Sequence, residues 1–418
     1  MREYPRGASS QNAPLKLAIK KYTPIDNLNP QPGDVTLIGA HGCGFAKELY
    51  EPLWEELLAR CQSNGFRIRA IWVADAANQG ASGIINENYL GNDPSWLDHG
   101  RDLLHMINHF RDEMPQPIMG DELMQECRMF LSHLHPRLLR SLLVIEPFIW
   151  DQDTGTNGVS VLLALTAEKK DVWNDRGQAA DKARQKLRIW DPRVLDRWVQ
   201  YGYRELPSAI HPDKKTSGSV TLSTSKHQEL LTYLRANFNQ HRELGLEDSP
   251  ESRKVNDPPP PHDPLFQPDM IGGLYANQRF YRAEPLMAWR RLPHLRPSVL
   301  YLSGGRSDLS KSGLMERAAK MTGTGIGGSG GMQRKQVMNV VFPKAFHTLP
   351  FENVASTAEA LAPWISQQIG QWREDERQVA EGWEGMSAKW KSTLSREWVT
   401  NLFASLQDME RRKKAAKL

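Results

Sequence analysis

The stretch PIMGDELMQECRMFLSHLHPRLLRSLLVIEP, residues 117–147, contains two apolar β-type runs separated by a helical pattern. Pro117–Met119 predicts the start of a short strand, Leu123–His135 a helix, and Leu142–Ile145 a buried strand. A strand, a helix and a second strand in this order form the unit from which parallel sheets are built. The stretch therefore predicts an α/β fold.

The same alternation extends on both sides of this stretch. The other predicted strands are Leu15–Tyr22, Val35–Gly39, Ile68–Val73, Val299–Ser303 and Val337–Phe342. The other predicted helices are Ala46–Cys61, Trp96–Phe110, Leu314–Met321 and Ser356–Ile369. We therefore expect a mainly parallel sheet that is covered by helices on both faces.

The alternation stops between Asp151 and Pro293. This region has longer Trp- and Arg-rich helical patterns, including Val172–Trp198 and His227–Leu244, and the run Pro258–Pro261 must be extended or turned. We interpret it as an inserted cap. The predicted domains are the first part of an α/β core over 1–150, a mostly helical cap or lid over 151–292, the second part of the core over 293–372, and a helical C-terminal tail over 373–418.

Composition indicates a soluble globular protein. The chain has 418 residues, of which 39% are hydrophobic and 24% charged, enough for one large core or a core with a cap. The formal charge is +4, and much of the basic excess gathers at Arg411–Lys414. Because that is a property of the tail, we predict no nucleic-acid-binding surface.

Membrane spans and metal sites are not expected either. No stretch approaches the ~18 apolar residues that a membrane span needs, and the amino terminus lacks the apolar region of a signal peptide. Cys43, Cys61 and Cys127 are too few and too irregularly spaced for a disulfide framework or a zinc site, which favours a reducing compartment. We expect no metal and no other cofactor.

The last three residues predict a cellular location. Ala416, Lys417 and Leu418 form a small-basic-leucine tripeptide of the peroxisomal import type, which an import receptor would bind. The alternative is a solvated helix end that finishes in leucine by chance, in which case the protein is cytoplasmic. We favour peroxisomal import.

Two glycine-rich stretches differ in what surrounds them. Thr322–Gly331 has neither the preceding strand nor the Gly-Lys-Ser/Thr ending of a phosphate-binding loop, so we expect a flexible loop. Gly39–Phe45 lies between a predicted strand and a predicted helix. That is where an oxyanion-hole loop needs small residues, because backbone N–H groups must converge there on one oxygen. Gly42 and Cys43 are the candidate amide donors.

Several segments together resemble one protein family. They are His41–Trp54, Gly91–Trp96, His133–Leu138, Trp190–Trp198 and Thr322–Gly325. The chain is similar over about residues 15–370 to the α/β-hydrolases of fungal secondary metabolism typified by the mycophenolic-acid acyl-CoA hydrolase and the AK-toxin biosynthesis hydrolase. The resemblance implies an α/β-hydrolase fold with a cap, and a substrate such as a polyketide, meroterpenoid or alkaloid intermediate.

In that family the nucleophilic serine lies in a Gly-His-Ser-Met-Gly-Gly turn, thirteen residues before the histidine of a His-Pro-Arg-Leu block. The same count back from His135 gives Glu122, so the resemblance implies that glutamate replaces the serine. Gly120 is kept, whereas Met124 stands where the family has a glycine, which puts the tight turn in doubt. The amide of Leu123 takes the place of the second oxyanion donor.

The two other positions of the catalytic triad carry suitable residues. Glu146 follows the strand after the nucleophile helix, 24 residues beyond Glu122, and His347 precedes a Pro-Phe-Glu block, as the family's acid and histidine do. The alternatives are a capped strand-end glutamate and a half-buried core histidine. Asp308, after a later strand, is a lesser candidate for the acid.

Replacing serine by Glu122 changes the chemistry that the site favours. A carboxylate is a weak nucleophile toward a thioester but a good general acid or base. We therefore predict non-hydrolytic acid/base chemistry, such as cyclisation, elimination by a lyase, isomerisation or decarboxylation, that uses Glu122 and His347. One alternative is hydrolysis of an ester or acyl-CoA by water activated by the glutamate. The other is an inactive binding protein in which Glu122 pairs with His347.

Aromatic side chains in the predicted cap suggest an apolar, polycyclic or long-chain substrate. These candidate substrate contacts are Trp173, Trp190, Trp198, Tyr201, Phe280 and Met287. The alternative for each of them is ordinary packing within the cap. The sequence leaves the oligomeric state open, and a homodimer is one candidate.

Overall fold

The computed structural model describes residues 2–123, 127–151, 161–214, 217–236, 264–270 and 280–416. The chain divides into two compact units, Met1–Ile369 and Gly370–Leu418. No helix in these described ranges is long and apolar enough to cross a membrane.

A seven-stranded sheet forms the centre of the first unit, in the order β1-β3-β2-β4-β5-β11-β12. The strands are β1 Ile19–Tyr22, β2 Val35–Gly39, β3 Ile68–Ala74, β4 Ile118–Leu123, β5 Ser141–Ile145, β11 Ser298–Gly304 and β12 Val337–Phe342. Only β1 pairs antiparallel, at the edge next to β3. The other pairs are parallel, which confirms the predicted sheet.

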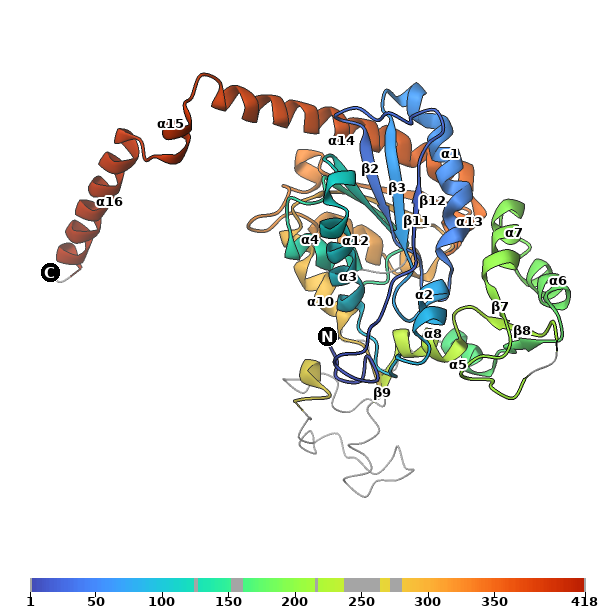
Figure 1. Ribbon diagram of the computed structural model, residues 1–418. Helices are drawn as coiled ribbons and strands as arrows, with labels where there is room; N and C mark the ends of the chain where they lie inside the picture. Colours follow the sequence, from blue (N-terminus) through green and yellow to red (C-terminus); the bar gives the residue numbers. More distant parts are fainter. Residues whose placement is uncertain are drawn as a thin grey trace. The chain divides into compact units, whose positions relative to one another are not determined.

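Helices cover both faces of this sheet, and Figure 1 shows α1 and α13 on one side with α3, α4 and α12 on the other. In β5, Leu143 and Ile145 belong to one hydrophobic cluster, while Leu142 and Val144 belong to the other. Alternate strand residues point to opposite faces. A strand between two covered faces must therefore be apolar throughout, which is why its run was recognisable in the sequence.

The covering helices have the following bounds: α1 Glu51–Cys61, α3 Trp96–His109, α4 Cys127–Leu134, α12 Leu314–Met321, α13 Leu349–Glu352 and α14 Val354–Trp383. Shorter segments connect them: η1 Lys47–Tyr50, η2 Gln62–Asn64, α2 Gly80–Asn86, η3 Arg111–Glu113, η6 Leu292–His294, α11 Asp308–Lys311 and η7 Met332–Arg334. The second unit continues with α15 Ala388–Ser392 and α16 Arg396–Ala415. Lys417 and Leu418, two residues of the predicted import signal, lie outside the described residues.

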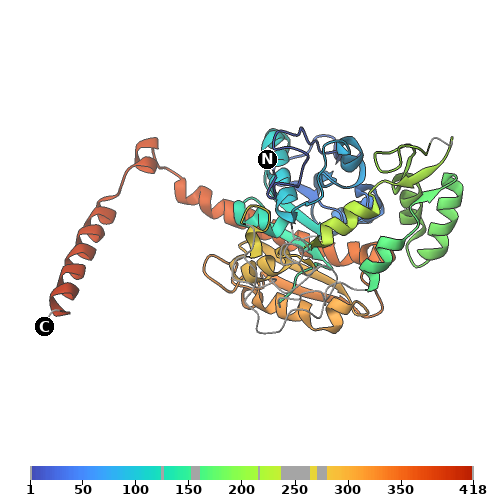
Figure 2. The same cartoon turned by 90° about the horizontal axis from the view of Figure 1, so that it is seen from below.

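The cap region combines helices with small sheets, and in Figure 2 its green helices extend to one side of the first unit. The helices are α5 Val161–Glu168, α6 Arg176–Lys186, α7 Pro192–Tyr201, α8 Lys226–Tyr233 and α10 Glu284–Arg291, with the short helix η5 Pro268–Met270. The strands β6 Val172–Trp173, β8 Val220–Leu222 and β7 Tyr203–Glu205 form one sheet, and β9 Arg235–Ala236 pairs with β10 Phe280–Tyr281.

The prediction of one helical stretch over Val172–Trp198 was too coarse. Asp175 caps α6 by accepting a hydrogen bond from the Gln178 amide, and Asp191 caps α7 by accepting one from the Arg193 amide. Each aspartate starts a helix of its own because its side chain satisfies an amide that has no partner in the first turn. The helix predicted over His227–Leu244 ends at Tyr233, and its part beyond Ala236 lies outside the described residues.

The glycine-rich stretch after α12 is tied to the chain that precedes β11. Gly323 N donates to Leu292 O over 2.9 Å, and Gly325 N donates to Pro293 O over 2.7 Å. Several of its glycines adopt positive φ angles, among them Gly327 at 79°. The loop predicted to be flexible is therefore hydrogen-bonded to its neighbours, and glycine is needed for its backbone conformation.

Candidate active site

Glu146 lies directly after β5 and is completely buried. Its carboxylate accepts three hydrogen bonds: from Gly304 N over 2.5 Å, from Ser307 Oγ over 2.7 Å and from His347 Nδ1 over 2.8 Å. Its φ angle of 53° is in the left-handed region that non-glycine residues rarely adopt. Strain of this kind concentrates at functional sites, where surrounding contacts hold it in place.

His347 lies between β12 and α13, and 44% of its side chain is exposed. Glu146 Oε2 forms hydrogen bonds with Ser307 Oγ and with His347 Nδ1. An ionised carboxylate has no proton to donate, so Nδ1 of His347 must carry the proton of the bond between the histidine and Glu146. This tautomer leaves Nε2 as the basic nitrogen of the ring. The structure thus brings the predicted acid and the predicted histidine together.

Close backbone packing joins β11 to the histidine loop. A Cβ atom on Gly304 would lie 2.4 Å from the Phe346 carbonyl oxygen and 2.5 Å from that of Ala345. No side chain fits at such distances. Glycine at the end of β11 therefore lets the Gly304 amide donate to Glu146. At the same time, the backbone of the segment that carries His347 packs closely against Gly304.

Glu122 belongs to β4, where its Cα pairs with that of Val144 in β5, and Leu123 pairs with Ile145. Both residues thus lie beside the strand that ends at Glu146. The side chains of residues 121–123 and the whole of residues 124–126 lie outside the described part of the chain. The helix predicted from Leu123 begins instead at Cys127, because strand pairing continues through Leu123.

Side chains accept hydrogen bonds from two backbone amides of the predicted oxyanion loop, one on each side of Cys43. Gly42 N donates to the Tyr50 hydroxyl over 2.8 Å, and Gly44 N donates to Gln79 Oε1 over 2.8 Å. Gly42, one of the two predicted donors in this loop, therefore has its amide proton engaged, contrary to our expectation. Among the described residues, none accepts a hydrogen bond from the Cys43 amide, which makes it the remaining candidate.

Two buried side chains of this loop, those of His41 and Cys43, favour their neutral forms. Burial raises the pKa of the Cys43 thiol to about 12, so the thiol is not a nucleophile. Burial also lowers the pKa of His41, and its Nε2 accepts a hydrogen bond from the Ala76 amide. Both side chains thus support the loop and carry no charge near it.

Asp308, the lesser candidate for the acid, does not contact His347. It is the first residue of α11, its side chain is 97% exposed, and it pairs with Lys311 over 3.1 Å. Ser307, its neighbour, points to Glu146 instead. The turn after β11 therefore supplies a hydroxyl donor to the pair of Glu146 and His347, and no second carboxylate.

The predicted substrate-contacting aromatics are packed against other side chains. Trp173 belongs to the core of the cap, and Trp190 belongs to one of the two main hydrophobic clusters. Trp198, Tyr201 and Met287 are partly buried against such clusters, and Phe280 lies in β10. Packing, the alternative considered for these residues, accounts for their described contacts.

Helix α8 of the cap lies over the oxyanion loop. The thiol of Cys43 donates to the Glu229 carbonyl over 3.6 Å, and a Cβ atom on Gly44 would lie 3.1 Å from the Glu229 side chain. Gln79 belongs to the α/β core, and its Nε2 donates to Thr232 Oγ1 over 3.3 Å. The cap thus contacts the loop directly and also through Gln79.

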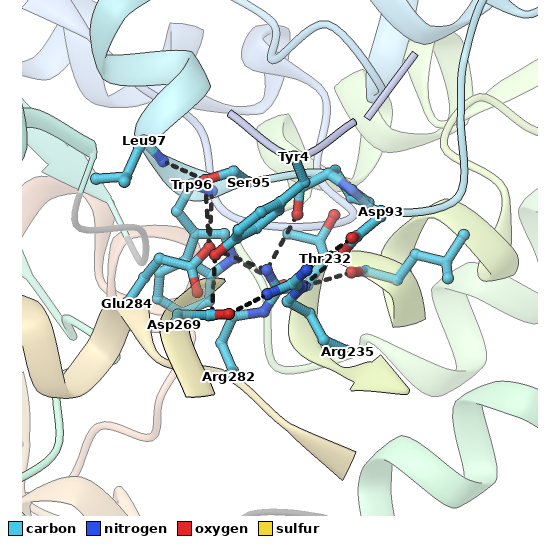
Figure 3. Close-up of polar contacts among 12 residues, drawn as sticks. Tyr4, Asp93, Ser95, Trp96, Leu97, Thr232, Arg235, Asp269, Arg282 and Glu284 are labelled. Carbon is cyan, nitrogen blue, oxygen red and sulfur yellow. Dashed lines mark hydrogen bonds and ion pairs between the residues drawn. The ribbon is translucent and has the colours of Figure 1, made fainter. Parts of the chain in front are cut away.

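A buried ionic network anchors the end of α8 (Figure 3). Arg235, just beyond α8, binds Asp93 through two nitrogen atoms over 2.7 and 2.8 Å and Asp269 through a third over 2.6 Å, as drawn in Figure 3. Its guanidinium lies 3.4 Å from the centre of the Tyr4 ring. Paired charges of this kind fix geometry because an unpaired charge at a buried position is costly. The network therefore joins the amino-terminal segment, the loop before α3 and the cap.

A second part of the same network lies beside it. Arg282 donates to Glu284 Oε1 over 3.0 Å and to the Leu231 carbonyl over 2.6 Å. Glu284 Oε1 also accepts from the Trp96 amide over 3.2 Å, and the Trp96 indole donates to the Thr232 carbonyl over 2.7 Å. Figure 3 shows Arg282, Glu284, Trp96 and Thr232 beside Arg235 and its partners.

A solvent-open pocket lies between α2 and the cap. The charged groups along its described lining are paired, Arg204 with Glu87 over 2.7 Å and His211 with Asp171 over 3.2 Å. The described lining residues thus offer no unpaired charge to a ligand. Within the described ranges, no group of three or more His, Cys, Asp or Glu side chains could hold a metal ion.

Sequence reasoning missed Ser307, Gly304 and Gln79. The first two stand in the segment Gly304–Asp308 that follows a predicted strand, and only the fold decides which of its side chains faces Glu146. Gln79 lies in a stretch without a recognisable pattern. Nothing in the sequence marks it as a partner of the loop at Gly44.

Comparisons with known proteins place this chain in a family. The chain is 38% identical over 409 residues to the type I acyl-CoA thioesterase mpaH of Penicillium roqueforti (strain FM164), covering 93% of this chain and 90% of that protein. It is 39% identical, with the same coverage, to mpaH of Penicillium brevicompactum. The chain belongs to their family, the α/β-hydrolases of fungal secondary metabolism.

More distant relatives agree with this family assignment. The abhydrolase domain-containing protein AFT2-1 of Alternaria alternata is 27% identical over 262 residues, covering 60% of this chain and 84% of that protein. The solved structure of the peroxisomal α/β-hydrolase Lpx1 of Saccharomyces cerevisiae matches with a TM-score of 0.60 at 14% identity, covering 99% of this chain and 95% of that one. It confirms the predicted α/β-hydrolase fold. No family model matches the chain.

Proposed function

We propose that this α/β-hydrolase-family enzyme moves protons on an apolar intermediate of fungal secondary metabolism, by general acid/base catalysis and without an acyl-serine. The observation that carries the proposal is the 2.8 Å hydrogen bond from His347 Nδ1 to the buried carboxylate of Glu146. A buried carboxylate on Nδ1 orients the ring and leaves Nε2 to take or give a proton. The 44% exposure of the His347 side chain keeps that proton exchange accessible.

Glu122 is the proposed second proton carrier. Counting back from His135 assigns it to the nucleophile position of the family, and its strand pairs with the one that leads to Glu146. A carboxylate there transfers protons well, whereas its attack on a thioester would give a short-lived anhydride. Cyclisation, lyase, isomerisation and decarboxylation reactions all need this pairing of an acid with a base.

The Cys43 amide is the proposed donor to a developing oxyanion. The amides on either side of it are already bonded to Tyr50 and Gln79, so only the middle one is left to the substrate. One oriented donor of this kind contributes about 10²–10³-fold in rate where it acts. It would stabilise an enolate as well as a tetrahedral intermediate.

Hydrolysis of an acyl-CoA thioester is the second candidate. The name of the mpaH relatives, type I acyl-CoA thioesterase, favours it at 38–39% identity. In this reaction His347 or Glu122 would deprotonate a water molecule that attacks the thioester carbonyl. The same proton carriers serve both candidates, which differ in whether water enters the product.

One product analysis separates the two candidates. Purified protein is incubated with a panel of acyl-CoA thioesters with polycyclic aromatic or long-chain acyl groups, and with the matching free acids, and the products are identified by mass spectrometry. An isomerised, cyclised or decarboxylated product without release of CoA supports the first candidate, and release of CoA with uptake of water supports the second. If no probe is converted although ligands bind, the non-catalytic alternative holds.

For location, the prediction from Ala416, Lys417 and Leu418 is import into peroxisomes. Deleting these residues from a fluorescently tagged protein should change a punctate signal into a cytosolic one. A punctate signal that persists would contradict the prediction.

A further inference from the structure

The segment that carries His347 is held on both sides of the histidine by one side chain. Glu352, the last residue of α13, turns its carboxylate back toward the residues next to His347. Its Oε2 accepts a hydrogen bond from the Phe346 amide over 3.1 Å, and its Oε1 accepts one from Thr348 Oγ1 over 2.5 Å. Glu352 thus fixes the backbone just before and just after the histidine.

The Thr348 hydroxyl connects this carboxylate to the cap. A hydroxyl has one proton, and Thr348 donates it to Glu352. Its lone pairs are then available as acceptors, and the indole Nε1 of Trp190 donates to them over 3.2 Å. The hydrogen bonds therefore form a chain in which Trp190 donates to Thr348 and Thr348 donates to Glu352.

Trp190 is itself held firmly. It is buried, and its ring centre lies 4.8 Å from that of Phe351 and 5.7 Å from that of Phe45. The next residue, Asp191, donates its backbone amide to the Phe351 carbonyl over 2.8 Å. The connection between α6 and α7 is thus attached to α13 by two hydrogen bonds and by ring packing. Phe45, one of these two aromatic partners, ends the predicted oxyanion loop.

We infer that Glu352, Thr348 and Trp190 are positioning residues, which hold the imidazole of His347 in line with Glu146 and make its orientation depend on the cap. The inference deepens the proposed function and rests on His347 being the proton carrier. The ring itself has one hydrogen bond among the described contacts, that to Glu146. Its direction therefore follows from the backbone of residues 346–348, which the chain of hydrogen bonds fixes.

The size of the effect follows from how steeply catalysis depends on placement. A displacement of about 1 Å in a catalytic group can reduce the rate about 10²-fold. A hydrogen bond to a carboxylate stabilises the closed form of the segment that it holds. Its loss should therefore shift the equilibrium for local opening of residues 346–348 about 10-fold or more. Loosening residues 346–348 should thus lower turnover and leave substrate binding much less affected.

The test uses the full-length chain and pairs of matched variants. Thr348→Val keeps the shape of the side chain but removes the hydroxyl, whereas Thr348→Ser keeps the hydroxyl. Trp190→Phe keeps an aromatic ring and removes the N–H, and Glu352→Ala removes both acceptors at once. Folding of each variant is checked first by its thermal midpoint and by its near-ultraviolet circular dichroism.

The main readout does not require activity. In protein labelled with ¹⁵N at histidine, NMR follows the proton on Nδ1 of His347 and its rate of exchange with water, and His347→Ala assigns the signal. We expect exchange about 10-fold faster in Thr348→Val and Glu352→Ala, a smaller increase in Trp190→Phe, and a rate within about 2-fold of wild type in Thr348→Ser. In any reaction found with the acyl-CoA panel, kcat should fall in the same order while KM changes little.

Rates within about 2-fold of wild type in Glu352→Ala and Thr348→Val, with both variants folded, would overturn the inference. So would equal exchange rates in Thr348→Val and Thr348→Ser. Failure of the proposed function would look different, because His347→Ala would then leave turnover of the acyl-CoA panel unchanged. The exchange rates would still show whether the three residues hold the imidazole in place.

Discussion

The ends of two neighbouring strands, β4 and β5, differ in the part that each takes in the candidate site. Beyond β5, Glu146 is buried, accepts three hydrogen bonds and contacts His347. At the end of β4, Glu122 is the residue that we propose at the family's nucleophile position. Under the proposed function, the end of β5 orients the base, and the end of β4 carries a second proton carrier in place of a serine.

Under this proposal, the parts of a catalytic triad can change independently. The carboxylate of Glu146 accepts hydrogen bonds from a backbone amide, a hydroxyl and an imidazole, which come from the end of β11, the turn after it and the histidine loop. These three donors thus belong to segments other than β4. A scaffold of this kind can keep an oriented base while the chemistry next to it changes.

The largest expected effect is on the proton-handling half. His347→Ala should reduce conversion of the acyl-CoA panel about 10³-fold, because general acid/base catalysis contributes about 10²–10⁴-fold. The matched control is His211→Ala, which breaks another imidazole–carboxylate pair, that with Asp171 in the cap. Steady-state kinetics of both variants check the prediction, and equal losses in the two would contradict it.

Glu122→Gln should lower the rate about 10²-fold, because glutamine keeps the size of the side chain and cannot carry a proton. Glu316→Gln, at an exposed position of α12, serves as the control. The rate is measured on the same panel. If Glu122→Gln kept the wild-type rate while His347→Ala lost activity, His347 would act without Glu122. The end of β4 would then supply no proton carrier.

Gln79→Ala should reduce the rate about 10-fold, since it frees the Gly44 amide and loosens the loop that holds the Cys43 donor. Asn78→Ala is the matched control, because Asn78 bonds Gln228 and Thr232 of α8 without an observed bond to the loop. A loss confined to Gln79→Ala would support the assignment of the Cys43 amide. Equal rates in both variants would mean that the Gly44 contact does not matter to catalysis.

The smallest effect is expected at Ser307. Ser307→Ala removes one of three donors to the buried Glu146 and should cost about 1–3 kcal/mol in the free energy of unfolding, with a modest loss of rate. Ser312→Ala removes a hydroxyl from the same segment that bonds only the Leu309 carbonyl among its described partners. Denaturant unfolding of both variants measures the difference. Identical midpoints would show that Glu146 does not depend on this hydroxyl.

Much of the sheet could be predicted because strands covered on both faces are apolar runs. Val35–Gly39, whose residues are all buried, matches β2 at both ends. The cap was harder, since its short strands, such as β6 with two residues, leave no periodic signal. The end of β4 was misjudged because pairing with β5, and not local preference, sets where that strand stops.

In the site, the sequence predicted which residues could meet but not the contacts that surround them. Glu146 and His347 were both candidates, and the structure places them 2.8 Å apart, while their catalytic roles stay predictions. That the amide of Gly42 bonds Tyr50 depends on where η1 packs, which spacing alone does not reveal. The choice between Ser307 and Asp308 depends on a single turn after β11.

The central claim is that Glu122 occupies the nucleophile position and that the native chemistry forms no acyl-serine. Intact-mass spectrometry of wild type and Glu122→Ser after incubation with the acyl-CoA panel tests it most directly. We expect an acyl adduct, or newly gained thioester hydrolysis, in Glu122→Ser and no covalent adduct on the wild type. An acyl group on a serine of the wild type, or a Glu122→Ser variant that folds but neither acylates nor hydrolyses any thioester of the panel, would contradict it.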